Sequence, residues 1–130
     1  MFKVYIIINE THKLTVEQKD QIYEFIDYIL DDEYKGLRDY ESYIEHIKIP
    51  ATGIKLVEME KLAEEIYENY VVFVSPVPAL MKLVAEKKQD KMGGSIKKSM
   101  VVFHNDKREK IELPNGKVIS VVAKDGWKLV

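Results

Sequence analysis

The sequence predicts an α/β fold in which helices flank a mostly parallel sheet, with a C-terminal β-hairpin. Short β-branched apolar runs alternate along the chain with longer segments whose apolar residues recur at helical spacing. The links between successive runs are long enough to hold the helical crossover that parallel neighbours require. The dipeptide Asn115-Gly116, between two further short runs, indicates the hairpin turn.

The composition is that of a single globular domain over residues 1–130. Apolar residues make up 46% and charged residues 32% of the chain, which argues against disorder. Because there is no cysteine, disulfides, thiolate zinc sites and a cysteine nucleophile are excluded. The apolar N-terminal stretch ends at Ile8, too short to span a membrane, and lacks a signal peptide's cleavage pattern. We therefore expect a cytoplasmic protein without membrane association.

Four segments are expected to form the parallel strands. The first and third are nearly continuous apolar runs, typical of strands covered on both faces. The second is weaker because charged and polar residues interrupt its isoleucines. The four strands are expected near residues 2–8, 43–49, 70–74 and 100–103.

Helices are expected between these strands. Thr15 and Gln18 have the spacing of a capping box that opens the first helix. The second helix is expected over residues 56–67. Ser75 and Pro76 stand where an N-cap and a first helical residue belong, so they are expected to open the third.

The C-terminal part is expected to end in the hairpin, with strands over residues 111–113 and 117–122. Trp127 is expected to fold back onto the core. The Gly-Gly-Ser segment at residues 93–95 predicts a flexible break before the fourth strand.

Charge is distributed unevenly along the chain. Residues 1–70 carry 8 Lys and Arg against 16 Asp and Glu, whereas residues 71–130 carry 12 against 6. A basic C-terminal half suits a protein that binds a phosphorylated ligand. The alternative is that the two halves neutralise each other in the fold.

Polar residues follow each expected parallel strand. Ligands of wound sheets bind beyond the carboxyl ends of the strands, where the strand order reverses. Hydroxyls, imidazoles, amides and cations gathered there would suit phosphate and ribose groups. The candidate ligand-binding residues are Asn9, Thr11, His12, Lys13, Thr52, Gly53, Ser75, Pro76, His104 and Asn105, with Lys107 and Arg108 following them.

Each of these clusters also has a structural interpretation. For Ser75 the alternative is a helix cap alone, and for the loop histidines His12 and His104 it is the absence of any catalytic role. No spacing matches a metal-ligand pattern, so we expect no metal and no other cofactor. The chain has no Gly-x-Gly-x-x-Gly, phosphate-loop or Gly-x-Ser-x-Gly motif, which weakens dinucleotide, kinase-like and hydrolase interpretations.

The segment Asn9-Glu10-Thr11-His12-Lys13-Leu14-Thr15-Val16-Glu17-Gln18 resembles a motif of the small CRISPR-associated Rossmann-fold (CARF) proteins of type III CRISPR systems. There a first strand ends in Asn, followed by Ser or Thr, His, and a Leu-Thr-x-Glu-Gln helix start. The segment from Ser75 to Leu80 is loosely similar as well. Lys107, Arg108 and the Asn-Gly hairpin correspond to nothing in that pattern.

The resemblance implies a Rossmann-like fold and a homodimer that binds a cyclic oligoadenylate second messenger, cyclic tetra-adenylate first, damping the antiviral response. Some members act as ring nucleases, metal-independent phosphodiesterases, and others only sequester the ring. For that reaction we expect His12 as the acid–base or phosphate-donor residue and Asn9, Thr11 and Ser75 as positioning groups. Lys107 and Arg108 are added as catalytic candidates for their charge and their place after the fourth strand, and not from the resemblance. Duplex nucleic acid is not expected as a partner. The alternative is a non-enzymatic module whose sheet edge or hairpin binds a protein.

Overall fold

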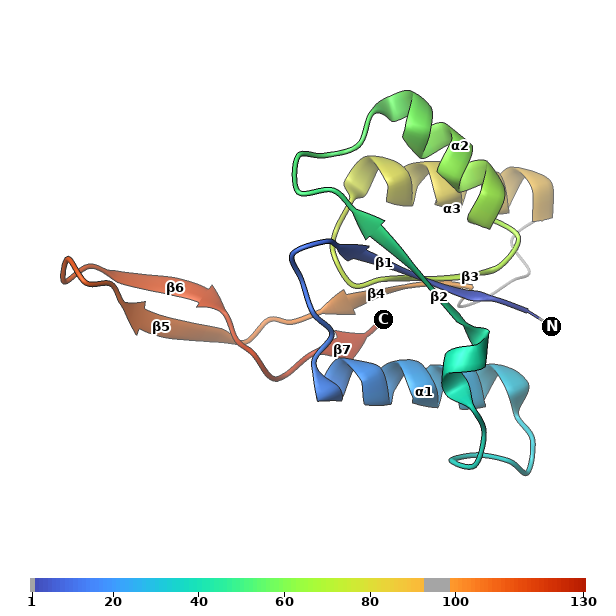
Figure 1. The fold of residues 1–130 in the computed structure, drawn as a ribbon, viewed down its shortest axis with the longest axis horizontal. Helices are drawn as coiled ribbons and strands as arrows, with labels where there is room; N and C mark the ends of the chain where they lie inside the picture. Colours follow the sequence, from blue (N-terminus) through green and yellow to red (C-terminus); the bar gives the residue numbers. More distant parts are fainter. Residues whose placement is uncertain (1, 93–98) are drawn as a thin grey trace.

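The computed structural model describes residues 2–92 and 99–130, so the predicted break at residues 93–95 lies outside the described residues. A five-stranded sheet has helices on both faces, and a two-stranded hairpin projects from it (Figure 1). The elements are β1 (Val4–Asn9), α1 (Val16–Leu30), a 3-10 helix (Tyr40–Tyr43), β2 (Ile44–Ile49), α2 (Leu56–Ile66), β3 (Tyr70–Phe73), α3 (Pro78–Met92), β4 (Met100–His104), β5 (Arg108–Glu112), β6 (Val118–Val122) and β7 (Lys128–Leu129).

The sheet has the strand order β2-β1-β3-β4-β7, and its first four strands are parallel. The predicted parallel core is therefore confirmed. The chain runs outward from β1 to β2 and then returns past β1 to β3 and β4. Because right-handed crossovers in opposite directions lie on opposite faces, α1 covers one face while α2 and α3 cover the other (Figure 1).

Two hydrophobic clusters, one on each face, hold the helices to the sheet. Along β1, Ile6 and Ile8 face α1, whereas Ile7 lies in the cluster beneath α2 and α3. This alternation follows from the two-residue repeat of a strand. All three isoleucines are buried, which explains the continuous apolar run of the first segment.

The first helix begins as the sequence predicts. The Gln18 amide N donates to Thr15 Oγ1 at 3.1 Å, and the Thr15 amide N donates to Gln18 Oε1 at 3.1 Å. The capping box is thus complete, and it sets the start of α1 just beyond the carboxyl end of β1.

The predicted start of the third helix is wrong. Helix α3 begins at Pro78, three residues beyond Ser75, so Ser75 is not its N-cap and Pro76 is not its first residue. Pro78 takes the first helical position, where a missing N–H costs nothing. The Ser75 hydroxyl does not cap the helix and instead accepts the Asn9 amide N–H.

The C-terminal segment returns to the sheet after the hairpin. Strand β5 begins at Arg108, earlier than the sequence predicts, and β7 pairs antiparallel with β4, a strand that the sequence patterns miss. Trp127 packs edge-on against Phe103 with ring centroids 6.4 Å apart, as expected of a residue that folds back onto the core. Within the described residues, no helix is both long and apolar enough to cross a membrane.

Lys88 is the one charged residue among the buried positions of the described chain. Its Nζ donates to the backbone carbonyls of Tyr67 and Asn69, at 2.7 and 2.6 Å, just beyond α2. Lys88 therefore ties α3 to the carboxyl end of α2. Burial lowers the pKa of Lys88 to about 8.

We predict that Lys88→Met lowers the free energy of unfolding by about 1–2 kcal/mol at pH 7, because two carbonyls lose their donor while a desolvated charge is removed. Urea denaturation measures this, with the exposed Lys82→Met as control, expected to change it by less than about 0.5 kcal/mol.

The difference in stability between the wild type and Lys88→Met should also depend on pH. The unfolded chain binds more protons at Lys88 between about pH 8 and its ordinary pKa of 10.5, so wild-type stability should rise relative to Lys88→Met across that window. A constant difference between the two proteins from pH 7 to 10 would contradict this assignment.

Candidate functional site

The carboxyl ends of the four parallel strands lie at one edge of the sheet, and two of the candidate residues meet there. The Asn9 amide N donates to Ser75 Oγ at 2.9 Å. The two strands they follow, β1 and β3, are adjacent, and the strand order reverses between them. Asn9 and Ser75 thus stand where wound sheets bind their ligands.

The loop after β1 is a compact turn organised by Asn9. Its Oδ1 accepts the Thr11 amide N–H at 3.0 Å and the Thr11 hydroxyl at 2.8 Å, and its carbonyl accepts the His12 amide N–H at 2.9 Å. The side chain of Asn9 therefore mimics a backbone turn. This turn fixes the positions of Thr11 and His12 at the sheet edge.

His12 contacts the buried first turn of α1. Its Nε2 lies 3.3 Å from Gln18 Oε1. Since that oxygen only accepts, the contact assigns the proton of a neutral imidazole to Nε2 and leaves Nδ1 as an acceptor. Gln18 is fully buried, yet its Nε2 has no hydrogen-bond partner among the described residues. A buried water beside His12 would satisfy this amide donor.

The turn after β2 is joined to this loop by Glu10. The Ala51 amide N donates to Glu10 Oε1 at 2.8 Å, and the Glu10 amide N donates to the Ile49 carbonyl at 2.9 Å. Gly53 has a φ of +96°, which favours glycine. Thr52 is exposed in the same turn. Glu10 is a positioning residue that sequence patterns do not distinguish from any other loop carboxylate.

Asn105 has an internal role. Its Nδ2 donates to the carbonyls of Ala123 and Asp125 at 3.0 and 2.8 Å, and its Oδ1 accepts the Lys107 amide N–H at 2.9 Å. The buried side chain therefore joins the segment that enters the hairpin, at Lys107, to the segment that leaves it, at Ala123 and Asp125. His104, by contrast, is exposed opposite Lys128 in the β4–β7 pair.

The two catalytic candidates that follow β4 hold contacts within the C-terminal segment. Lys107 Nζ lies 3.0 Å from the Asp125 carboxylate, which raises the pKa of Lys107 and lowers that of Asp125. Arg108 Nη1 donates to the Asn105 carbonyl at 3.3 Å. In the described part of the chain, no hydrogen bond or ion pair joins either cation to the loop after β1.

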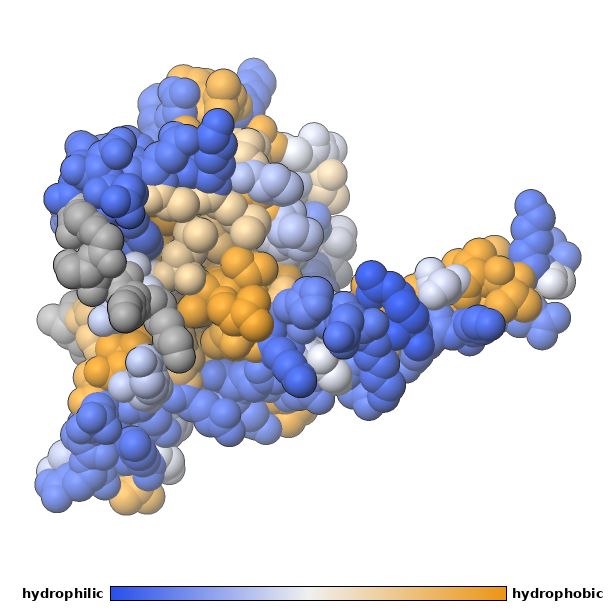
Figure 2. All heavy atoms as spheres, turned by 180° about the vertical axis from the view of Figure 1, so that it is seen from behind, coloured by the Kyte–Doolittle hydropathy of each residue, from blue (hydrophilic) through white to orange (hydrophobic). Residues whose placement is uncertain are grey.

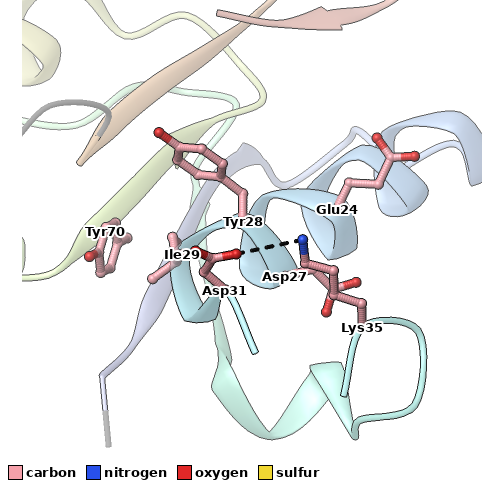
Figure 3. A pocket seen from close by; sticks show the side chains of 7 residues that line it. All are labelled: Glu24, Asp27, Tyr28, Ile29, Asp31, Lys35 and Tyr70. Atoms are coloured by element: carbon pink, nitrogen blue, oxygen red, sulfur yellow. Dashed lines mark ion pairs between the residues drawn. The ribbon is translucent and has the colours of Figure 1, made fainter. Parts of the chain in front are cut away.

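A hollow of about 630 Å³ lies elsewhere, between the end of α1 and the start of β3 (Figure 3). Two of its three carboxylates are engaged, because Asp31 pairs with Lys35 and Asp27 accepts from Tyr40 and Arg38. Burial alone would raise the pKa of Asp27, but these hydrogen bonds outweigh it and lower that pKa. Wound sheets do not use this amino end for ligands. We therefore assign the candidate site to the carboxyl edge of the sheet, where hydrogen bonds hold the candidate residues in place.

Metal chemistry receives no geometric support from the described residues, among which no group of three or more His, Asp or Glu could hold an ion. No protein-family model, curated protein or solved structure matches the chain.

We predict that Asn105→Ala lowers the free energy of unfolding by about 2–3 kcal/mol, because it leaves buried polar groups at the hairpin base without partners. Asn115→Ala at the hairpin tip is the matched control, since Asn115 Oδ1 accepts the Lys117 amide N–H in the same way but is exposed. Equal losses for the two variants, measured in urea, would show that Asn105 does not join the hairpin ends.

Proposed function

We propose that this chain is a Rossmann-like, CARF-like protein that binds a cyclic oligoadenylate, cyclic tetra-adenylate first, at the carboxyl edge of its sheet. The observation that carries this is the contact between Asn9 and Ser75 at the reversal of strand order. It brings together the two segments whose sequences resemble the CARF pattern.

The donors at this edge suit the ligand. A cyclic oligoadenylate offers phosphate oxygens, ribose hydroxyls and adenine nitrogens. Thr11 and His12 project from the turn after β1, and the buried Gln18 amide behind them lacks an acceptor among the described residues. A buried water that also contacts a phosphate or adenine acceptor of the ligand would satisfy that amide.

Cleavage of the bound ring would need only a few of these groups. A ribose 2′-hydroxyl attacks the adjacent phosphorus, the bond to the 5′-oxygen breaks, and a 2′,3′-cyclic phosphate forms. In this scheme His12 Nδ1 accepts the hydroxyl proton, the leaving 5′-oxygen takes a proton from solvent water, and His12 then returns its proton to the resulting hydroxide. Lys107 and Arg108, which contact Asp125 and the Asn105 carbonyl, are the proposed groups for stabilising the charge that develops on the phosphate.

We expect Thr11→Val/His12→Gln to weaken binding of cyclic tetra-adenylate at least tenfold, since two polar groups that face the ligand are removed. Calorimetry in EDTA measures the affinity, and chromatography of the same samples detects cleavage. Ser42→Ala, which removes an exposed hydroxyl near the start of β2, is the control with unchanged affinity. Failure of the wild type to bind either cyclic tetra- or hexa-adenylate at micromolar concentration would overturn the proposal.

A second candidate function, protein interaction through the hairpin, is favoured by one observation. The hairpin projects from the body and exposes an apolar patch (Figure 2). Ile111, Val118, Ile119 and Val122 are 41%, 61%, 38% and 44% exposed. A two-stranded hairpin on its own is only marginally stable in water, so pairing with a further strand would stabilise this hairpin.

We propose that this partner is a second copy, in a homodimer. Strand β6 reads Val-Ile-Ser-Val-Val and carries no charge, so no charged side chain opposes pairing at its outer edge. About a two-fold axis at Ser120, Val118 would face Val122 of the partner subunit, and Ile119 would face the partner's Val121. An isologous interface of this kind closes as a dimer and pairs the outer edge of β6.

We predict that Val118→Lys/Val122→Lys converts a wild-type dimer to monomer, because each lysine would face another across the axis. Light scattering at micromolar concentration reads the mass. Val16→Lys/Val57→Lys adds the same charge at two exposed valines on helices and should leave the dimer intact. A monomeric wild type would remove the homodimer from the proposal.

A further inference from the structure

A cationic groove of about 310 Å³ lies between the loop after β1, the first turns of α1 and the edge strand β2. Three lysines and two histidines line it, with apolar residues as the remainder and no acidic residue. The lining residues are His12, Lys13, Lys19, His46, Lys48, Ile8 and Leu14.

The pleat of β2 explains why its basic residues gather on this side. His46 pairs in register with Ile6 and Lys48 with Ile8, the β1 residues that face α1. Glu45 lies one position away, in register with Tyr5, which packs in the cluster on the other face. The strand thus places its two basic side chains towards α1 and its carboxylate away from it.

The three lysines of the groove have no counter-ion in the described part of the chain. None of them forms an ion pair, although other exposed lysines, such as Lys35 and Lys82, do. Two carboxylates of the same segments are engaged elsewhere: Glu10 accepts from the Ala51 amide, and Glu17 accepts from the Trp127 amide.

This gathering runs against the charge of the surrounding sequence. Residues 1–70 carry twice as many acidic as basic residues, 16 against 8, and yet three of those eight basic residues share one groove. Like charges held close together destabilise a fold unless an anion offsets their repulsion. The lining residues are therefore suited to a ligand that carries several negative charges.

We propose that this groove binds the phosphate backbone of a short single-stranded oligonucleotide. Its cations reach from three elements, so they can contact successive phosphates. The groove has no Phe, Tyr or Trp on which a base could stack, so the binding would come from phosphate contacts, which do not read base sequence. Because β2 is the edge strand, an extended ligand can leave the groove without meeting a further strand. This inference does not rest on the proposed function, although His12 belongs to both sites.

The test is an amide and imidazole NMR titration of the wild type with oligothymidylate of four residues and, separately, with inorganic phosphate. We expect the largest shifts at His46, Lys48 and Lys19, and oligonucleotide binding at least tenfold tighter than phosphate binding. Equal affinities for the two ligands, or shifts centred elsewhere, would overturn the proposal.

The matched variants are Lys19→Gln/Lys48→Gln in the groove and Lys55→Gln/Lys61→Gln on exposed positions at α2. Both remove two positive charges from residues 1–70. The groove variant should bind the oligonucleotide about tenfold more weakly, with a salt slope smaller by roughly 0.7 for each phosphate that is no longer neutralised, and the control should match the wild type. Equal weakening in both variants would show that binding depends only on net charge, and it would overturn the groove as the binding site. Binding of oligothymidylate without cyclic tetra-adenylate binding would refute only the proposed function, and the reverse would refute only the groove.

Discussion

The hydrogen-bonding of β1 to strands on both sides is the constraint on which the rest of the structure depends. Its Ile7 carbonyl accepts the amides of both Val74 and Ser75, at 2.9 and 3.2 Å, as β3 ends. That bifurcated contact turns the chain after β3 towards β1 and places the Ser75 hydroxyl within reach of the Asn9 amide. The loop after β1, the start of α1 and the cationic groove all take their positions from this central strand.

Much of the fold could be predicted because local signals agree with the tertiary structure. The continuous apolar runs mark β1 and β3 since both of their faces are covered, and the capping box places α1. The predicted start of α3 is wrong because a serine after a strand fits both a helix N-cap and a residue that contacts the neighbouring strand. Only the position of Asn9 at the end of β1 shows that Ser75 has the second role. Strand β7 has two residues and no pattern of its own, since its pairing depends wholly on β4.

The candidate site was predictable in outline only. The rule that polar residues follow parallel strands placed Asn9 and Ser75 at one edge, but it could not separate ligand-facing side chains from those that hold the backbone. Asn105 is of the second kind, and its loop position looks the same in the sequence. The groove beside β2 was hidden because its lysines come from three separated segments, each unremarkable alone.

The place of the hairpin in the chain has a consequence for how this protein can vary. Residues 103 and 104 of β4 already pair with residues 128 and 129 of β7, and Asn105 joins the two ends of everything between them. The hairpin of β5 and β6 is thus an insertion between the paired strands β4 and β7, and Asn105 closes it at its base. It can lengthen, shorten or change its sequence over generations while the carboxyl edge of the sheet keeps its shape, so these two surfaces can evolve separately.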